Sequence, residues 1–155
     1  MSWTVEYLPA QGVIAVTATG EVSNADAEAQ VAEVIRLLKQ NHALRILVDY
    51  SEAVSEVSLP TLYNVPDHCT KSGAVWNVWA AVVLPRTRYR IDTYHFFELV
   101  CHNAGYNVRL FDSTDAAEHW LHEQSPGASG PIRHSEARAS LLGIPACAHH
   151  GPAGR

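Results

Sequence analysis

The spacing of hydrophobic positions at the start of the chain predicts a hairpin. Apolar and polar side chains alternate from Trp3 to Leu8, and a run rich in β-branched residues follows from Val13 to Thr19. A period of two is typical of strands, and the intervening Pro9-Ala10-Gln11-Gly12 is typical of a turn. We therefore predict two antiparallel strands at the N-terminus.

The spacing then changes to that of a helix and back to that of a strand. Ser23 or Asn24 can cap a first helix, and its apolar positions continue to near Asn41. Residues 44–49 are mostly apolar, as in a strand covered on both faces of a sheet. This segment predicts a buried central strand that ends at Asp49.

The next stretch is polar, and we expect it to be a loop on the functional side of the sheet. It runs from Ser51 to Ser58, where a second helix can begin with Ser58 as its cap. Pro66 lacks a backbone donor and its ring clashes with the preceding turn, so we expect this helix to be broken or kinked there.

The second half of the chain repeats the alternation of strands and helices. Residues Trp76 to Leu84 are apolar on both faces and predict another buried strand. Helical spacing from Thr93 to Gly105 predicts the next helix, and residues 106–111 predict a strand. Thr114 can cap a last helix, which closes the domain near Glu123.

This order of elements predicts an α/β fold. We expect a mixed, mostly parallel five-stranded sheet with an N-terminal β-hairpin and about four helices. Residues 1–123 would form this domain, and residues 124–155, which are rich in glycine and proline, would form a flexible tail. Because the carboxyl ends of parallel strands meet at one edge of a sheet, we expect any site to lie there.

Composition narrows the class of partner and the compartment. The net charge of −5 argues against nucleic acid as a partner. The most apolar run, residues 74–84, is too short to span a membrane, and the first residues lack the pattern of a secretory signal, so we predict a cytoplasmic protein. The three cysteines are an odd number and widely spaced, which favours reduced thiols.

The motifs of common enzymes are missing from the sequence. It has no glycine-rich phosphate loop after a strand and no Gly-x-Ser-x-Gly turn around a nucleophilic serine. We therefore predict no catalytic residue and no cofactor, and we interpret the chain as a protein that is not an enzyme.

Three arginines form the best candidate for a polar binding site. Arg86, Arg88 and Arg90 follow a predicted strand and precede a helix N-terminus, where backbone donors favour an anion. Asp49 ends the neighbouring strand. The alternative, which we favour, is a solvated loop whose arginines moderate an acidic surface.

Two further groups of side chains are weaker candidates. His95, Glu98 and His102 share one helix face and could hold a metal ion, although we interpret this face as solvated surface. Abundant aromatic residues could instead line an apolar pocket or simply fill the core, and we favour the core.

With these elements in place, the chain resembles a STAS-type domain. The segments that carry the resemblance are Phe96-Phe97-Glu98-Leu99-Val100-Cys101-His102-Asn103-Ala104-Gly105, Val108-Arg109-Leu110-Phe111 and Ala116-Ala117-Glu118-His119-Trp120-Leu121. They are similar to a helix, a strand and a closing helix of small bacterial STAS-like proteins. The fold is that of bacterial anti-sigma-factor antagonists and of the cytoplasmic domains of sulfate transporters. The resemblance covers residues 1–123.

The resemblance implies a non-enzymatic module that works through protein–protein contacts. Some members of the family bind a nucleotide or a lipid-like ligand, and the related CRAL-TRIO fold carries lipids. In the anti-sigma-factor antagonists, a serine in an Asp-Ser-Ser-Gly-like stretch is phosphorylated to switch partner binding. Here the stretch from Ser51 to Ser58 lacks the glycine, and Ser58 matches only by its place before the helix.

Three hypotheses follow. The first is a cytoplasmic binding or regulatory module whose partner is a protein, a second copy of the chain or an anionic or lipid-like small ligand. Its contact residues would be Asp49, Ser51, Ser58, Arg86, Arg88 and Arg90. The second is a carrier of a lipid or another apolar small molecule in a pocket lined by Trp79, Tyr94 and Phe97. The third is a metal-dependent enzyme that uses His95, Glu98 and His102.

Overall fold

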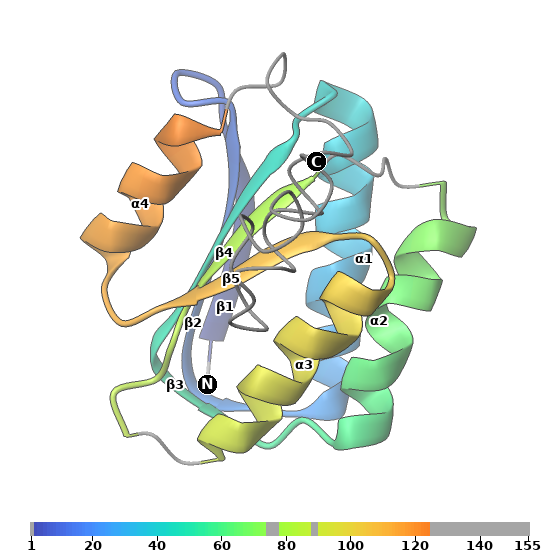
Figure 1. Cartoon of the computed structure of the whole chain (residues 1–155), viewed down its shortest axis with the longest axis vertical. Coiled ribbons are helices and arrows are strands. Elements are labelled where there is room, and N and C mark those ends of the chain that lie inside the picture. The colour runs from blue at the N-terminus through green and yellow to red at the C-terminus, as the bar shows by residue number, and fades with distance from the viewer. Residues whose placement is uncertain (1, 74–77, 88–89, 125–155) are drawn as a thin grey trace, which may run out of the picture. The chain divides into compact units, whose positions relative to one another are not determined.

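Five strands form one sheet in the order β1-β2-β3-β4-β5 (Figure 1). The computed structural model describes residues 2–73, 78–87 and 90–124. β1 and β2 are antiparallel, and β2, β3, β4 and β5 are parallel to one another. The strands are β1 (Ser2–Leu8), β2 (Val13–Val22), β3 (Arg45–Ser55), β4 (Trp79–Val83) and β5 (Asn107–Phe111). The predicted fold class and the N-terminal hairpin are confirmed.

Four helices cover the sheet, as the sequence predicts. Three of them, α1 (Asn24–Asn41), α2 (Leu59–Lys71) and α3 (Ile91–Asn103), pack on one face, and α4 (Thr114–Glu123) packs on the other (Figure 1). Ser23 caps α1 in a capping box with Asp26. The cap of α4 is Ser113, whose side chain accepts from the backbone N–H of Ala116, so the assignment of Thr114 as cap was wrong.

Strand β3 is longer than the sequence predicts. It runs to Ser55, so Ser51 lies within a strand rather than in a loop. β2 continues to Val22 and supplies the backbone partners for this extension, with a register shift between Thr17 and Thr19. Such a bulge changes which side chains face the core, so Tyr50 and, after the shift, Ala53 are both buried. The sequence analysis missed this part of the strand because its composition is polar, since only alternate side chains of the extension face the core.

Helix α2 continues through Pro66 to Lys71, so the expected break does not occur. Pro66 lies inside the helix and its side chain is buried. A proline removes one backbone hydrogen bond, and the packing of its apolar ring can offset part of that loss. Of the thirteen residues of α2, all of them described, Pro66 alone is buried.

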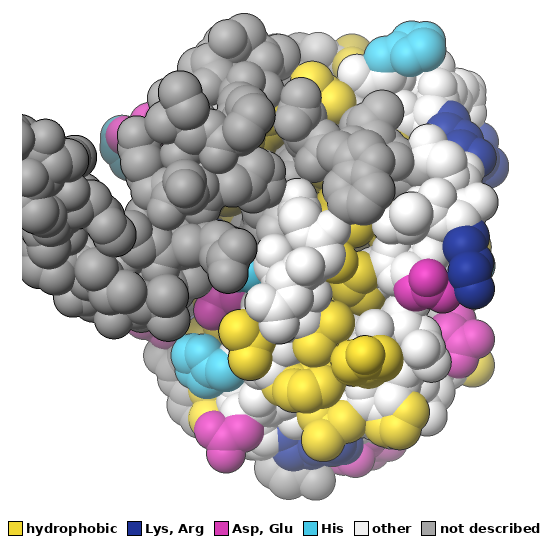
Figure 2. Space-filling model, turned by 45° about the vertical axis from the view of Figure 1, so that its right-hand side comes forward, with side chains coloured by type: hydrophobic (Ala, Val, Ile, Leu, Met, Phe, Trp, Pro, Cys, Tyr) yellow, Lys and Arg dark blue, Asp and Glu magenta, His cyan; other side chains and the backbone are white. Residues whose placement is uncertain are grey.

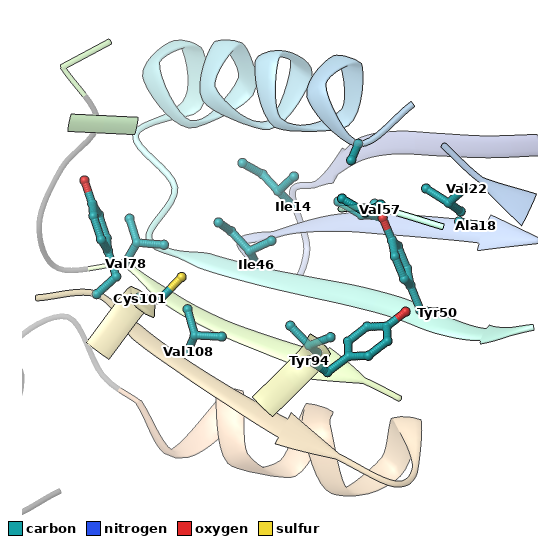
Figure 3. Packing of buried hydrophobic residues seen from close by; sticks show 14 of the residues in the cluster. Ile14, Ala18, Val22, Ile46, Tyr50, Val57, Val78, Tyr94, Cys101 and Val108 are labelled. Carbon is teal, nitrogen blue, oxygen red and sulfur yellow. The ribbon is translucent and has the colours of Figure 1, made fainter. Parts of the chain in front are cut away.

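The sheet separates two hydrophobic clusters. The larger lies under α1, α2 and α3 and includes Ile14, Ile46 and Val82 (Figure 3). The smaller lies between the sheet and α4, where Ala81 and Ala117 have no exposed surface. Both faces of the central strands are therefore covered, as their apolar composition predicts.

Some expectations fall on residues that the structure leaves undescribed. These are Arg88, residues 76 and 77 at the predicted start of the fourth strand, Cys147 and all but the first residue of the predicted tail, 124–155. The boundary near Glu123 therefore stays a prediction. Among the described residues, no helix has both the length and the apolar character needed to cross a membrane.

Candidate functional site

Asp49 and Ser51 form a hydrogen-bonded pair where β3 extends beyond its pairing with β4. Asp49 Oδ1 accepts from the Ser51 backbone N–H at 3.0 Å and from Ser51 Oγ at 2.7 Å. The Ser51 carbonyl accepts from the backbone N–H of Arg86 at 3.2 Å. These contacts fix the connection after β4 against the extension of β3, and they use Asp49 and Ser51 as structural groups.

The two described arginines of the predicted cluster are each paired with a carboxylate of the β3 side. Arg86 contacts Glu52 at 2.7 Å, and Arg90 contacts Glu56 at 3.6 Å. Arg90 also has a left-handed backbone, with φ of 56°, directly before α3. The carboxylates reduce the positive potential, so the described residues do not form an isolated anion site. Exposed pairs of this kind contribute little to stability.

Ser58 caps α2 and links two helix N-termini. Its Oγ accepts from the Thr61 backbone N–H at 3.4 Å and is hydrogen-bonded to Thr61 Oγ1 at 3.1 Å. Its backbone N–H donates to Oδ1 of Asn24, the first residue of α1, at 2.8 Å. Both helices thus begin next to the carboxyl end of β3, as the topology requires.

The first turns of α2 expose large hydrophobic side chains that sequence reasoning missed. Leu59 is 45% exposed and Tyr63 is 62% exposed, and a separation of four residues places them on one helix face. Figure 2 shows hydrophobic side chains gathered on the face of the molecule that carries α2. The sequence did carry a signal for this exposure. The apolar residues of α2 spread over a wider part of the helix surface than a single buried stripe can hold.

The predicted aromatic pocket is divided between the two faces of the sheet. Tyr94 and Phe97 line a cavity of about 180 Å³ under α1, α2 and α3. Trp79 lies instead in the cluster under α4. Neighbouring strand residues point to opposite faces, so Ala80 rather than Trp79 faces the cavity.

Polar side chains meet at one end of this cavity. Tyr50 Oη donates to Gln30 Oε1 at 2.5 Å, and the rings of Tyr50 and Tyr94 meet edge to face with centroids 6.3 Å apart. Burial raises the pKa of Tyr94 to about 12 and raises the pKa of Tyr50 as well. Both phenols are therefore neutral at physiological pH. The sequence analysis did not identify Gln30 as a candidate site residue, because a glutamine in an amphipathic helix is usually solvated.

The described thiols are unsuited to nucleophilic chemistry. Cys101 is buried and Cys69 is half-buried. Burial raises the pKa of Cys69 to about 11, and it raises the pKa of Cys101. Because the thiolate is the reactive form, both thiols are protonated at neutral pH.

His95, Glu98 and His102 all lie on α3, as predicted, but they do not form a metal cluster. Throughout the described part of the chain, no three histidine, cysteine or carboxylate side chains come close enough to hold a metal ion together. The geometry therefore gives the metal-dependent hypothesis no support.

Comparison with solved structures places this architecture among known folds. The chain is similar to the anti-sigma-factor antagonist SpoIIAA in its unphosphorylated form, with a TM-score of 0.53, 9% identity and coverage of 79% of this chain and 100% of that chain. It is also similar to an uncharacterised DUF3478-family protein with a SpoIIAA-like fold from Shewanella loihica PV-4. That match has a TM-score of 0.51, 16% identity and coverage of 77% and 92%. This chain has a STAS-like fold.

Similarity in sequence is much weaker than similarity in structure. No protein-family model matches the chain, and no curated protein matches it significantly. The STAS-like fold thus confirms the resemblance at the level of architecture. Within it, the described residues form two distinct features, namely the exposed surface at the start of α2 and the cavity beneath α1, α2 and α3.

Proposed function

We propose that this chain is a non-enzymatic regulatory module of the cytoplasm that binds a protein partner at the start of α2. The single observation that carries the proposal is the exposure of Leu59 and Tyr63 directly after the Ser58 cap. Large exposed side chains on one helix face are typical of contact surfaces, and tyrosine is enriched among residues that dominate binding energy. We name Ser58, Leu59 and Tyr63 the α2 surface.

Charged pairs near the α2 surface suit the rim of a protein interface. Glu56 precedes Ser58 by two residues and pairs with Arg90, while Glu52 pairs with Arg86. An apolar centre with a polar, solvated border is the usual anatomy of such interfaces. Because exposed ion pairs contribute little to folding, a partner can rearrange them at small cost.

The structural comparison supports regulation by protein contact. One of the similar structures is an anti-sigma-factor antagonist, a name that describes a protein acting on another protein. The described polar groups also fit this proposal better than catalysis. Ser51 is hydrogen-bonded to the carboxylate of Asp49, which is a weak base and does not activate a serine as a histidine would.

Regulation at Ser58 is a finer part of the proposal. Phosphorylation there would place negative charge at the positive end of the α2 dipole, which favours the helix, and beside Glu56, which opposes it. It would also change the charge of the α2 surface directly. We expect Ser58→Asp to alter partner recovery relative to Ser58→Ala, and unchanged recovery by both variants would count against the switch.

Partner capture with matched surface variants tests the proposal. The full chain would be crosslinked in its host, and the captured proteins quantified for the wild type, Tyr63→Ser, Leu59→Ser and Leu99→Ser. Leu99 is 58% exposed on α3 and serves as the control. We expect Tyr63→Ser and Leu59→Ser to reduce recovery of a specific partner about tenfold or more, and Leu99→Ser to leave it unchanged.

Two results would contradict the proposal. Equal recovery by all four proteins would show that the α2 surface makes no specific contact. Robust turnover in a broad screen for esterase, phosphatase and metal-dependent activities would show that the chain is an enzyme.

A further inference from the structure

The cavity under α1, α2 and α3 is apolar and has unfilled volume. Its volume is about 180 Å³, and its walls come from the sheet and all three helices. Valine side chains from the sheet, such as Val48, Val82 and Val108, line it, and none of the described residues that line it is charged. A cavity of about 150 Å³ in another protein binds benzene, so this one has room for a single ring with a small substituent.

Two polar atoms at one end of the cavity have no partner. Gln30 Nε2 and the Tyr94 hydroxyl form no hydrogen bond with any described residue, although Gln30 is only 4% exposed and Tyr94 only 7%. Ser55 lies near enough to offset part of the rise that burial causes in the pKa of Tyr94, but the two side chains do not reach hydrogen-bonding geometry. An unpaired buried donor is costly, so native proteins usually supply it with a partner.

Tyr50 holds these groups together at the same end. Its hydroxyl donates to Gln30 Oε1, and its ring packs edge to face against Tyr94. Figure 3 shows Tyr50 and Tyr94 side by side, with Cys101, Val78 and Val108 toward the other end of the cluster. The cavity therefore has a polar end with unused donors and an apolar remainder.

Water molecules alone would pair the two polar atoms but would not fill the apolar part of the cavity. A buried water needs two to four polar partners, and one molecule could bridge Gln30 Nε2 and the Tyr94 hydroxyl. The rest of the lining is mostly valine, leucine and isoleucine and offers further waters few partners. A bridging water would thus leave most of the volume unfilled.

We propose that the cavity binds a small, uncharged molecule with an apolar body and one oxygen acceptor. The acceptor, a carbonyl or ether oxygen, would receive hydrogen bonds from Gln30 Nε2 and the Tyr94 hydroxyl. A carboxylate or phosphate is disfavoured, because the described lining supplies no cation and an unpaired charge is expensive to bury. The body would occupy the space bordered by Val48, Val82 and Val108.

Helix α2 is the cover through which such a molecule would enter. The lining residues that keep some exposure include Val31 and Val34 of α1 and Leu62, Val65 and Cys69 of α2. Phe97 of α3 keeps some exposure as well, so partly exposed lining residues lie on α2 and on the helices to either side of it. Only one residue of the fully described α2 is buried, so this helix can move at a lower free-energy cost than a helix anchored by several.

Titration of the full chain with three related probes tests the proposal without any variant. Acetophenone has one ring and a neutral carbonyl, ethylbenzene has a similar shape without the oxygen, and benzoate carries a charge. We expect acetophenone to shift the valine methyl resonances of Val48, Val82 and Val108 and to leave those of Val13 and Val83, under α4, unchanged. Ethylbenzene should bind about threefold to tenfold more weakly, and benzoate more weakly still.

Variants then assign the parts of the site. Gln30→Leu should weaken acetophenone about threefold to tenfold and leave ethylbenzene unaffected. Ala80→Ile should abolish binding of both, because the added atoms enter the cavity. Thr17→Val, on an exposed position of β2, is the control and should change neither.

Three outcomes would overturn the proposal. Absence of any shift at Val48, Val82 and Val108 would show that the cavity does not admit the probe. Equal affinity of the wild type for acetophenone and ethylbenzene would show that the donors do not recognise an acceptor. Benzoate binding as tightly as acetophenone would show that the site does not select a neutral ligand.

Discussion

The two faces of the sheet differ in how completely side chains fill the space between the sheet and its helices. Under α4, Ala81 and Ala117 have no exposed surface, and the rings of Phe111 and Trp120 are 5.6 Å apart between centroids. Under α1, α2 and α3, a cavity of about 180 Å³ remains beside two unpaired polar groups. The residues around Ala81 and Ala117 are therefore closely packed, although a smaller pocket of about 130 Å³ lies on the same face beside Val13 and Leu47. The face under α1, α2 and α3 leaves the larger and more apolar space.

The same contrast separates α4 from α2. Residues Ala117 and Leu121 anchor α4 by full burial over ten residues. Helix α2 is longer, yet it buries Pro66 alone among its residues, all of which are described, and exposes Leu59 and Tyr63. A helix with little buried surface is suited to contact a partner and to move over a ligand.

The largest expected effect compares leucine truncations in these two helices. Leu121→Ala should lower the free energy of unfolding by about 2–5 kcal/mol, because Leu121 is fully enclosed under α4. Leu62→Ala should cost less, on the order of 1 kcal/mol, because Leu62 is half-buried and already borders unfilled space. Urea denaturation of both variants measures the difference, and equal losses would contradict the contrast.

Adjacent alanines of β4 provide a second comparison. Ala81→Ile adds atoms to the close-packed face and should cost about 1–3 kcal/mol of stability. Ala80→Ile adds the same atoms on the cavity side, where we expect no loss or a small gain. Thermal and urea unfolding of the two variants would decide, and a loss of similar size at Ala80 would mean that the space is not usable.

The tyrosines of the cavity should differ in their response to removal of the hydroxyl group. Tyr50→Phe leaves Gln30 Oε1 without its donor and should cost about 1–2 kcal/mol. Tyr94→Phe removes a hydroxyl that has no partner among the described residues, so it should change stability by less than about 1 kcal/mol. The reverse order in denaturation experiments would refute the assignment of the unpaired groups.

Acid sensitivity at the start of α1 is the smallest expected effect. Hydrogen bonds from Ser23 lower the pKa of Asp26 below 3.8 in the folded chain. The stabilisation is therefore present above pH 3.8 and is lost as the pH falls through the lowered value. Asp26→Asn should be less stable than the wild type at neutral pH and should match it in strong acid. A difference between their unfolding curves that is independent of pH would contradict this role.

The fold could be predicted because it depends on local patterns. The alternation from Trp3 to Leu8, the apolar run of β4 and the serines at helix starts each encode an element without reference to distant residues. The carboxyl half of β3 could not be predicted in this way. Its residues pair with the end of β2, and the register shift near Tyr50 depends on that pairing.

The candidate sites were predictable only in part. Strand order placed Asp49, Ser58 and the arginines near one edge, since topology alone determines that edge. The exposure of Tyr63 and the pairing of Arg86 with Glu52 depend on tertiary packing. The cavity was harder to predict than these contacts, because its unfilled volume depends on how side chains of α1, α2, α3 and the sheet fit together.

In both proposals helix α2 has the central role, as a movable cover of the cavity and as the contact surface of the module. Hydrogen exchange of the full chain, with and without saturating acetophenone, tests it most directly. We predict that amides of α2 exchange through openings of lower free energy than those of α4, and that acetophenone slows exchange in α2 more than in α4. Exchange in α2 as slow as in the central strands, or protection by acetophenone in α4 instead, would contradict the account.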